Sequence, residues 1–320
     1  MNIILCLIIF IATEWAFLRI AKARKIGAPV TERSSHTQFT PTCGGIIVPI
    51  ALIAFGAWHY EVLDTTWWLC IAGALVLAAV SFYDDIKPLS PGIRLFIQVA
   101  VVAGVYQQLC YPQAFHIYLL IIILGVGTIN TINFIDGITG MLGFYTIVLF
   151  GTFAYTLYTY IPAGNELYIQ LCILVILSMV SFLVFNIPDR IFAGDVGAIT
   201  IGFLAVCMCV HITIQTHNAS SIIFFIVSLF DAGFTTLQRL FAGKNILLPH
   251  REFIYEILTS RWHLPHVVVS LSYALLQLLI NALYFLIPAQ QHWTYLIATC
   301  ILLTFAYFAI RQSPKSRLDE

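Results

Sequence analysis

The sequence predicts an all-α integral membrane protein with about eleven transmembrane helices. Of its 320 residues, 60% are hydrophobic and only 9% are charged, whereas a soluble domain carries about 25% charged residues. A soluble fold of this length cannot bury so much apolar surface, so the lipid bilayer must be its solvent. The formal net charge is zero, which gives no global field for nucleic acid.

The apolar residues are grouped into segments of membrane-spanning length, about 17 to 25 residues. Eleven such segments are visible: 2–20, 45–60, 66–83, 93–109, 114–133, 141–161, 167–186, 197–216, 220–237, 266–288 and 292–310. The second and fourth are short. Residues 2–20 lack a preceding basic stretch and a following small-residue cleavage site, so we expect a retained first helix and no cleaved signal peptide.

The positive charges predict the orientation. All 15 Lys and Arg residues lie within or beside every second connection: 21–44, 84–92, 134–140, 187–196, 238–265 and the C-terminal tail. Because Lys and Arg favour the cytoplasmic side, we expect the N-terminus outside and the C-terminus in the cytoplasm. Residues 1–320 then form a single membrane domain, and its function should lie on the cytoplasmic face.

Carboxylates stand at two of these inner connections. Asp84 and Asp85 end the third segment, and adjacent carboxylates repel each other unless a metal ion or a basic side chain neutralises them. A solvated helix end beside Lys87 is the alternative. Asp195 follows Gly194 at the start of the eighth segment, where it could bind a metal ion beside phosphates or act as an ordinary helix cap.

Amides and a further carboxylate end the fifth segment. Asn130, Asn133 and Asp136 are spaced by three residues, which places them on neighbouring faces of a helix. Such groups can ligate Mg²⁺ or read a base. A polar helix end is the alternative, but it does not explain two amides inside an apolar run.

The basic candidates are Arg94, His250 and Arg251. Arg94 lies one turn into the fourth segment, where it could meet a phosphate or the Asp84–Asp85 pair, or could snorkel to the interface. His250 and Arg251 lie in the long connection 238–265. Arginine suits bidentate phosphate recognition, although a solvated basic loop would look the same.

Together these groups indicate one site on the inner face. Carboxylates, amides, Arg and His converge there without a serine or cysteine nucleophile motif. The eight cysteines lie mostly in apolar runs and are read as small buried hydrophobic residues. This inventory fits metal-assisted phosphoryl transfer, in which positioning and charge neutralisation do most of the work.

In order and spacing, the motifs resemble those of the polyprenyl-phosphate N-acetylhexosamine-1-phosphate transferases (glycosyltransferase family 4). The similarity extends from about residue 30 to residue 280. The residues that carry it are Arg33-Ser34-Ser35-His36 with Gly44-Gly45, Asp84-Asp85-Ile86-x-x-Leu89 with Arg94 and Gln98, Asn130-x-x-Asn133-Phe134-x-Asp136-Gly137, Asn186-x-Pro188, Phe192-x-Gly194-Asp195-x-Gly197 and His250-Arg251.

The resemblance implies a bacterial plasma-membrane enzyme that transfers a sugar-1-phosphate from a UDP-sugar to undecaprenyl phosphate, with Mg²⁺ or Mn²⁺. It implies Asp195 and Asn133 as the metal ligands. Asp84, Asp85 and His250 would be catalytic. The substrate-binding residues would be Arg94, Asn130, Asp136, Asn186 and Arg251.

Three positions depart from the family pattern. Thr139 stands where Asp or Asn is common, Phe253 replaces a second histidine, and Glu256 replaces a glutamine. The three-histidine run of the muramyl-pentapeptide branch is absent, which favours a simpler UDP-N-acetylhexosamine, with GlcNAc as the default. Two alternatives remain. A transporter or flippase would need polar groups toward the outer face, where the sequence has almost none, and an inactive relative is supported only by Thr139 and Phe253.

Overall fold

The computed structural model describes residues 2–28, 40–109, 115–161, 163–245 and 251–312. It is almost entirely helical, with one short antiparallel pair of strands, β1 (Gly27–Ala28) and β2 (Thr40–Pro41). The helices are α1 (Ile3–Arg24), η1 (Gly44–Ile46), α2 (Ile47–Trp58), α3 (Thr65–Ile86), α4 (Pro91–Leu109), α5 (Phe115–Phe134), α6 (Met141–Tyr160), α7 (Glu166–Asn186), α8 (Gly194–Thr216), η2 (Ala219–Phe225), α9 (Ile226–Phe241), α10 (Ile254–Ser260), α11 (His266–Leu286), η3 (Ala289–Gln291) and α12 (His292–Gln312).

The predicted all-α membrane fold is confirmed. Within the described residues, 10 helices are long and apolar enough to cross a bilayer. They coincide with ten of the eleven expected segments. The remaining one, expected at 45–60, is a shorter apolar helix over Gly44–Trp58. At 1.5 Å per residue it rises only about 22 Å, less than the roughly 30 Å hydrocarbon core.

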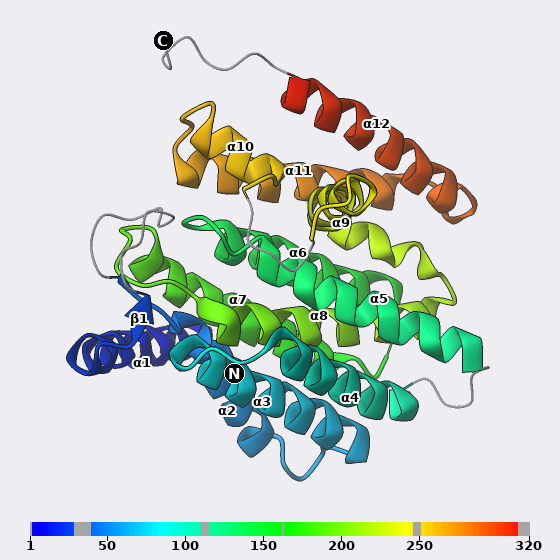
Figure 1. The fold of residues 1–320 in the computed structure, drawn as a ribbon. Coiled ribbons are helices and arrows are strands. Elements are labelled where there is room, and N and C mark those ends of the chain that lie inside the picture. The colour runs from blue at the N-terminus through cyan, green and yellow to red at the C-terminus, as the bar shows by residue number, and fades with distance from the viewer. Residues whose placement is uncertain (1, 29–39, 110–114, 162, 246–250, 313–320) are drawn as a thin grey trace.

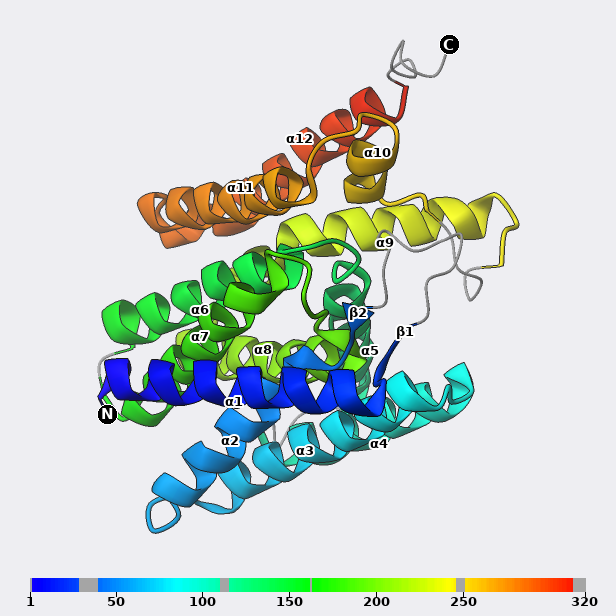
Figure 2. The ribbon, with the colours of Figure 1, turned by 90° about the vertical axis from the view of Figure 1, so that its left-hand side faces the viewer.

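Most of the long helices form stacked layers around α8, whereas α9 is seen end-on in Figure 1 and side-on in Figure 2 and so runs across its neighbours. Helices α1 to α4 lie on one side of α8, and α10, α11 and α12 form the layer farthest from them. α8 packs against α2, α3, α5 and α6. Consistent with this central place, it has the largest buried share of any candidate span among the described helices.

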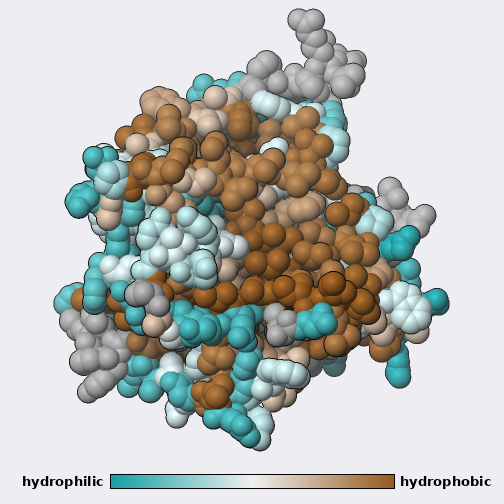
Figure 3. Space-filling model, turned by 180° about the vertical axis from the view of Figure 1, so that it is seen from behind, coloured by the Kyte–Doolittle hydropathy of each residue, from teal (hydrophilic) through white to brown (hydrophobic). Residues whose placement is uncertain are grey.

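The outer surface is that of a membrane protein. Figure 3 shows a broad continuous area of hydrophobic side chains, with hydrophilic ones mostly toward its edges. Large apolar side chains such as Leu286, Leu302 and Phe305 are about three-quarters exposed, at 79%, 69% and 71%. Side chains of this kind are stable on the outside only when lipid surrounds them.

One close backbone contact positions the start of α8. The N–H groups of Gly44 and Gly45 donate to the carbonyls of Phe192 and Ala193, at 2.8 and 2.9 Å. A Cβ atom on Gly45 would lie only 2.2 Å from Cα of Gly197. The turn before Asp195 is therefore held against the start of α2 by glycine packing and backbone hydrogen bonds.

Candidate active site

Two carboxylates from distant parts of the chain share one guanidinium group. Nη1 of Arg94 on α4 donates to Oδ2 of Asp84 at 2.7 Å and to Oδ2 of Asp195 at 3.0 Å. Asp84 ends α3, and Asp195 lies in the first turn of α8. The other oxygen of Asp84 accepts the N–H of Leu89 at 2.6 Å. A cationic group therefore lies between the acidic ends of α3 and α8.

Asp85 holds the first turn of α8 in place. Its two carboxylate oxygens accept the backbone N–H groups of Asp195 and Val196, at 3.0 and 3.2 Å. A carboxylate is favoured there because the first N–H groups of a helix have no partner within the helix. Gly194 has φ 72°, and a Cβ atom there would lie 2.6 Å from Oδ2 of Asp85. Glycine is required at this position on both grounds.

The last turn of α5 adds an amide, Asn133, and the turn that follows adds a fourth carboxylate, Asp136. Asn133 hydrogen-bonds through its side chain to Asp195. Asp136 accepts a hydrogen bond from the backbone of Gly194. Burial, followed by the charges of Asp195 and Asp85, raises the pKa of Asp136 well above its ordinary value. The sequence-predicted Asp84, Asp85, Asn133, Asp136 and Asp195 thus come together.

The donor set fits a single divalent cation. Across the described part of the chain, no group of three or more His, Cys, Asp or Glu side chains is arranged to hold a metal ion by itself. Mg²⁺ commonly needs only one or two carboxylates, because waters and substrate phosphates complete its octahedron. Nη1 of Arg94 stands where such an ion would be stabilised, between Asp84 and Asp195. This stand-in cation supports an ion site at the carboxylates.

Asn186 joins two turns at the base of the site. Its side-chain oxygen accepts the N–H of Gly140 at 2.7 Å, and its nitrogen donates to the carbonyl of Ile191 at 2.9 Å. The side chain is 4% exposed, so this geometry supports a positioning role within the protein. Next to it, the hydroxyl of Thr139 donates to Asp189. The Thr139 departure therefore adds a hydrogen bond between the same two turns.

The hydrogen bonds of Asn130 are made to other groups than the carboxylates. Its Nδ2 donates to Oε1 of Gln98 at 2.7 Å and to the carbonyl of Val126 at 2.8 Å. These bonds attach α5 to α4, the helix that carries Arg94. The structure therefore joins Asn130 and Gln98, which belong to two different motifs of the sequence.

The segment after His250 packs against the turn that carries Asn133 and Asp136. The ring of Phe253 stacks on that of Phe134, with centroids 5.7 Å apart, and the hydroxyl of Tyr255 donates to the carbonyl of Phe134 at 2.7 Å. The Phe253 departure thus contributes an aromatic contact. Arg251 is exposed beside it. His250 and the segment Arg33–His36 fall outside the described residues.

Some groups at the site have no counterpart in the sequence reasoning. Cys43, read as a buried hydrophobic residue, donates its S–H to Asp85 at 3.5 Å. Asp189 and Tyr255 each bridge two turns. Tyr255 matches the tyrosine of the family pattern in the last loop, but that pattern does not reveal its partner, which is a backbone carbonyl far away in the sequence.

Comparison with known proteins agrees with this geometry. The model of "Glycosyl transferase family 4" matches residues 67–213, which include Asp84, Arg94, Asn133, Asp136 and Asp195. Residues 67–213, a little under half of the chain, are thus similar to glycosyl transferase family 4. A relative from Bacillus subtilis (strain 168) is named "Probable undecaprenyl-phosphate N-acetylglucosaminyl 1-phosphate transferase". It is 24% identical over 326 aligned positions, which cover 95% of this chain and 90% of the relative.

The family match, the Bacillus relative and the ten apolar helices together make this chain a multi-pass bacterial membrane protein. Every contact among the acidic side chains of the cluster comes from within the region that the family model matches. The segment around Arg251 lies outside that region.

Glu256 makes the stability of this protein depend on pH. Its Oε2 accepts the N–H of Phe253 at 3.0 Å and so caps α10. The pKa of Glu256 is raised from 4.5 to about 7, chiefly because burial desolvates the carboxyl; the charges of Asp231 and Glu252 contribute to the rise, and the Phe253 N–H and Arg251 oppose it. A carboxyl with a raised folded-state pKa stabilises the fold below pH 4.5, and this contribution is lost as the pH rises through about 7.

Replacement of Glu256 with Gln, the family residue, should remove this loss because glutamine keeps the cap without titrating. We expect the difference in unfolding temperature, Glu256→Gln minus wild type, to increase from pH 5 to pH 8. Thermal unfolding of the purified proteins across that range measures it. Glu166→Gln, at an exposed first-turn glutamate of α7, is the matched control. Parallel curves for wild type and Glu256→Gln would contradict the prediction.

Proposed function

We propose that the protein transfers an N-acetylhexosamine-1-phosphate, by default GlcNAc-1-phosphate, from a UDP-sugar to undecaprenyl phosphate and releases UMP. This would be the first membrane step in the synthesis of a cell-envelope polysaccharide. The main support is the shared contact of Asp84 and Asp195 with Arg94. It brings acidic groups and a phosphate-binding side chain to one end of an apolar bundle.

The reaction breaks one phosphoanhydride bond and forms another. A phosphate oxygen of the lipid attacks the β-phosphorus of the UDP-sugar, and the bond from that phosphorus to the bridging oxygen breaks. The bridging oxygen leaves with its electron pair on UMP. We prefer this one-step course to a covalent aspartyl-phosphate intermediate. Phosphoryl transfer of this kind depends chiefly on positioning and charge neutralisation.

The acidic cluster would receive the cation and the acceptor. Asp195 and Asn133 would hold a divalent ion, Mg²⁺ or Mn²⁺, which supplies neutralisation of the diphosphate charge. Asp84 and Asp85 would orient the lipid phosphate and accept its proton when it is protonated. Asp85 is already fixed by two backbone N–H groups, so its orienting role needs little rearrangement.

The basic groups would receive the donor. Arg94 has a 37% exposed side chain and can turn from the carboxylates to the diphosphate. Arg251 and His250 would bind the diphosphate and sugar, so the connection 238–265 would contribute to the active site. Asp136 and Asn130 would support the nucleotide side, with Asn186 holding the turn beneath it.

The test is UMP release by the purified protein in lipid nanodiscs. Undecaprenyl phosphate, Mg²⁺ and a panel of UDP-N-acetylhexosamines are supplied, with and without EDTA. We expect release with one donor, dependent on the lipid and abolished by EDTA. If folded protein released no UMP from any donor, the proposal would be wrong.

A further inference from the structure

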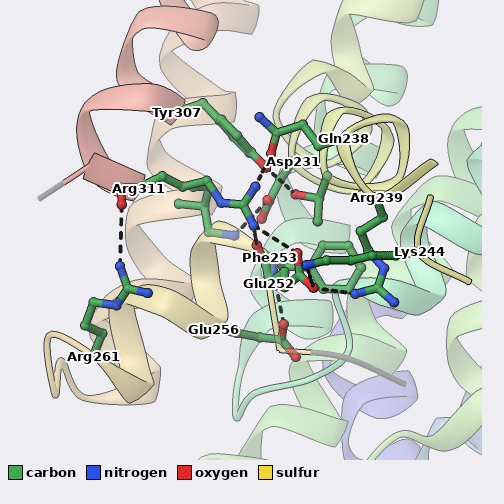
Figure 4. A network of polar contacts seen from close by, with 12 residues as sticks. Asp231, Gln238, Arg239, Lys244, Glu252, Phe253, Glu256, Arg261, Tyr307 and Arg311 are labelled. Carbon is green, nitrogen blue, oxygen red and sulfur yellow. Dashed lines mark hydrogen bonds and ion pairs between the residues drawn. The ribbon is translucent and has the colours of Figure 1, made fainter. Parts of the chain in front are cut away.

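Glu252 lies at the meeting point of three cations (Figure 4). Oε1 of Glu252 accepts from Arg239 and, at 3.0 Å, from Lys244. Oε2 of Glu252 lies 3.3 Å from Nη2 of Arg311. These partners come from the last turn of α9, the connection that follows it and the last turn of α12. We call Glu252, Arg239, Lys244 and Arg311 the Glu252 cluster.

The three ion pairs differ in exposure and therefore in strength. The side chain of Arg239 is 7% exposed, that of Arg311 22% and that of Lys244 52%. Exposed pairs contribute little, whereas loss of one member of a buried pair leaves an uncompensated charge. Arg239 and Arg311 are thus the less exposed partners of Glu252, and Lys244, which also contributes to its ionisation, has the most exposed side chain of the three.

The main chain at Glu252 is held as well. Nη2 of Arg311 donates to the carbonyl of Glu252 at 3.2 Å. Nη1 of Arg311 also donates to Oε1 of Gln238. The same oxygen accepts a hydrogen bond from the hydroxyl of Tyr307 at 2.9 Å. Arg311 on α12 therefore contacts both the side chain and the backbone of Glu252, in the α9–α10 connection.

The next residues are fixed from the opposite side. Phe253 and Tyr255 contact Phe134, and Asp231 on α9 accepts the N–H of Ile254 at 2.8 Å. The backbone on the C-terminal side of Arg251 is thus attached to α9, to α12 and to the turn that carries Asn133 and Asp136. Arg251 is the residue immediately before this fixed stretch.

We propose that Glu252 is a positioning residue for donor binding: held by Arg239 and Arg311, it sets the place of Arg251 relative to the carboxylate cluster. The inference rests on the proposed function, because Arg251 is there assigned to the UDP-sugar. It gives α12, which contains none of the site residues, a defined part in substrate recognition.

The charge state of Glu252 suits this role. Desolvation raises its pKa, but hydrogen bonds and charges from Lys244 and Arg239 outweigh it and hold the pKa below the ordinary value. Glu252 therefore stays ionised at neutral pH. A neutral glutamine of the same shape would keep hydrogen-bonding capacity and lose the attraction to both arginines.

The experiment compares Glu252→Gln, Arg311→Gln, Glu252→Asp and, as the matched control, Lys244→Gln. The Lys244 variant removes one charge from the same carboxylate at the exposed position. UMP release is measured to obtain one KM for the UDP-sugar and another for undecaprenyl phosphate. The two are compared because a general loss of folding would affect both substrates alike. Two further readouts need no turnover: calorimetric binding of UDP, and the rate of tryptic cleavage after Arg251.

We expect Glu252→Gln to raise KM for the UDP-sugar about tenfold or more, since a misplacement of about 1 Å can cost up to about a hundredfold. KM for the lipid should change by less than about twofold, which is well under 1 kcal/mol. UDP binding should weaken in parallel, and cleavage after Arg251 should become faster. Arg311→Gln should behave alike, Glu252→Asp should recover part of the loss, and Lys244→Gln should match wild type.

Two results would overturn the inference. One is unchanged UDP binding and cleavage in folded Glu252→Gln, and the other is an equal rise of both KM values, which would show a structural role alone. Failure of the proposed function looks different, because wild type itself would then release no UMP. In that case the UDP-binding and cleavage measurements still report whether Glu252 positions Arg251.

Discussion

Asp195→Asn should lower UMP release by on the order of a thousandfold while the protein remains folded. The substitution keeps the side-chain shape but removes the negative charge that faces Arg94 and Asn133. Loss of one preorganised electrostatic group in a water-poor site typically costs about 10² to 10³ in rate. Here the same change also removes the carboxylate that we assign to the metal ion. Steady-state UMP release measures the effect.

Asp64→Asn is the matched control for this prediction. Asp64 also stands at a helix N-terminus, where it accepts the N–H of Trp67 at 2.9 Å, and asparagine caps a helix about as well as aspartate. Its rate should equal that of wild type. Mn²⁺ binding measured by electron paramagnetic resonance adds a readout without turnover, and it should weaken only in Asp195→Asn. Full activity of Asp195→Asn would remove Asp195 from the catalytic machinery.

Gly45→Ala should destabilise the protein by about 3 kcal/mol or more, because overpacking of this severity lies at the upper end of measured effects. The new methyl group would lie 2.2 Å from Cα of Gly197 and 2.7 Å from its nitrogen. Both atoms belong to the backbone, so neither can turn away. Separation of η1 from α8 would also shift Asp195. We expect a lower unfolding temperature together with loss of activity.

Gly151→Ala gives the corresponding control within α6. No atom lies within 4 Å of a Cβ atom placed there, and alanine is favoured over glycine inside a helix by up to about 1 kcal/mol. Its unfolding temperature should be equal to or above that of wild type. A Gly45→Ala protein as stable as Gly151→Ala would show that η1 and α8 are not in backbone contact.

Much of the fold follows from local properties of the sequence. Hydropathy and segment length predicted every long apolar helix, because each membrane-spanning helix satisfies its backbone hydrogen bonds within itself. Only the segment 45–60 differs, and there the structure has a shorter apolar helix over Gly44–Trp58. The orientation inferred from the Lys and Arg residues stays a prediction.

The acidic site was partly predictable. The positions of Asp84, Asp85, Asn133, Asp136 and Asp195 at the ends of their segments predicted a shared location, and the structure brings them together. Asn130 and Asn186 matched the family motifs equally well. In the structure their side chains hydrogen-bond to other groups of the protein. A sequence motif does not tell such residues from those that face a substrate.

By itself, the sequence determined the membrane environment, the helical segments and the chemical inventory of the inner face, because composition and periodicity act over a few turns of one helix. Only the tertiary structure decided the partners. Arg94 and Asp195 are 101 positions apart, Arg311 and Gln238 are 73 apart, and Phe253 lies far along the chain from Phe134. Such pairs depend on which helices pack together, and that is decided by the shape of whole helix faces such as the Gly45–Gly197 contact.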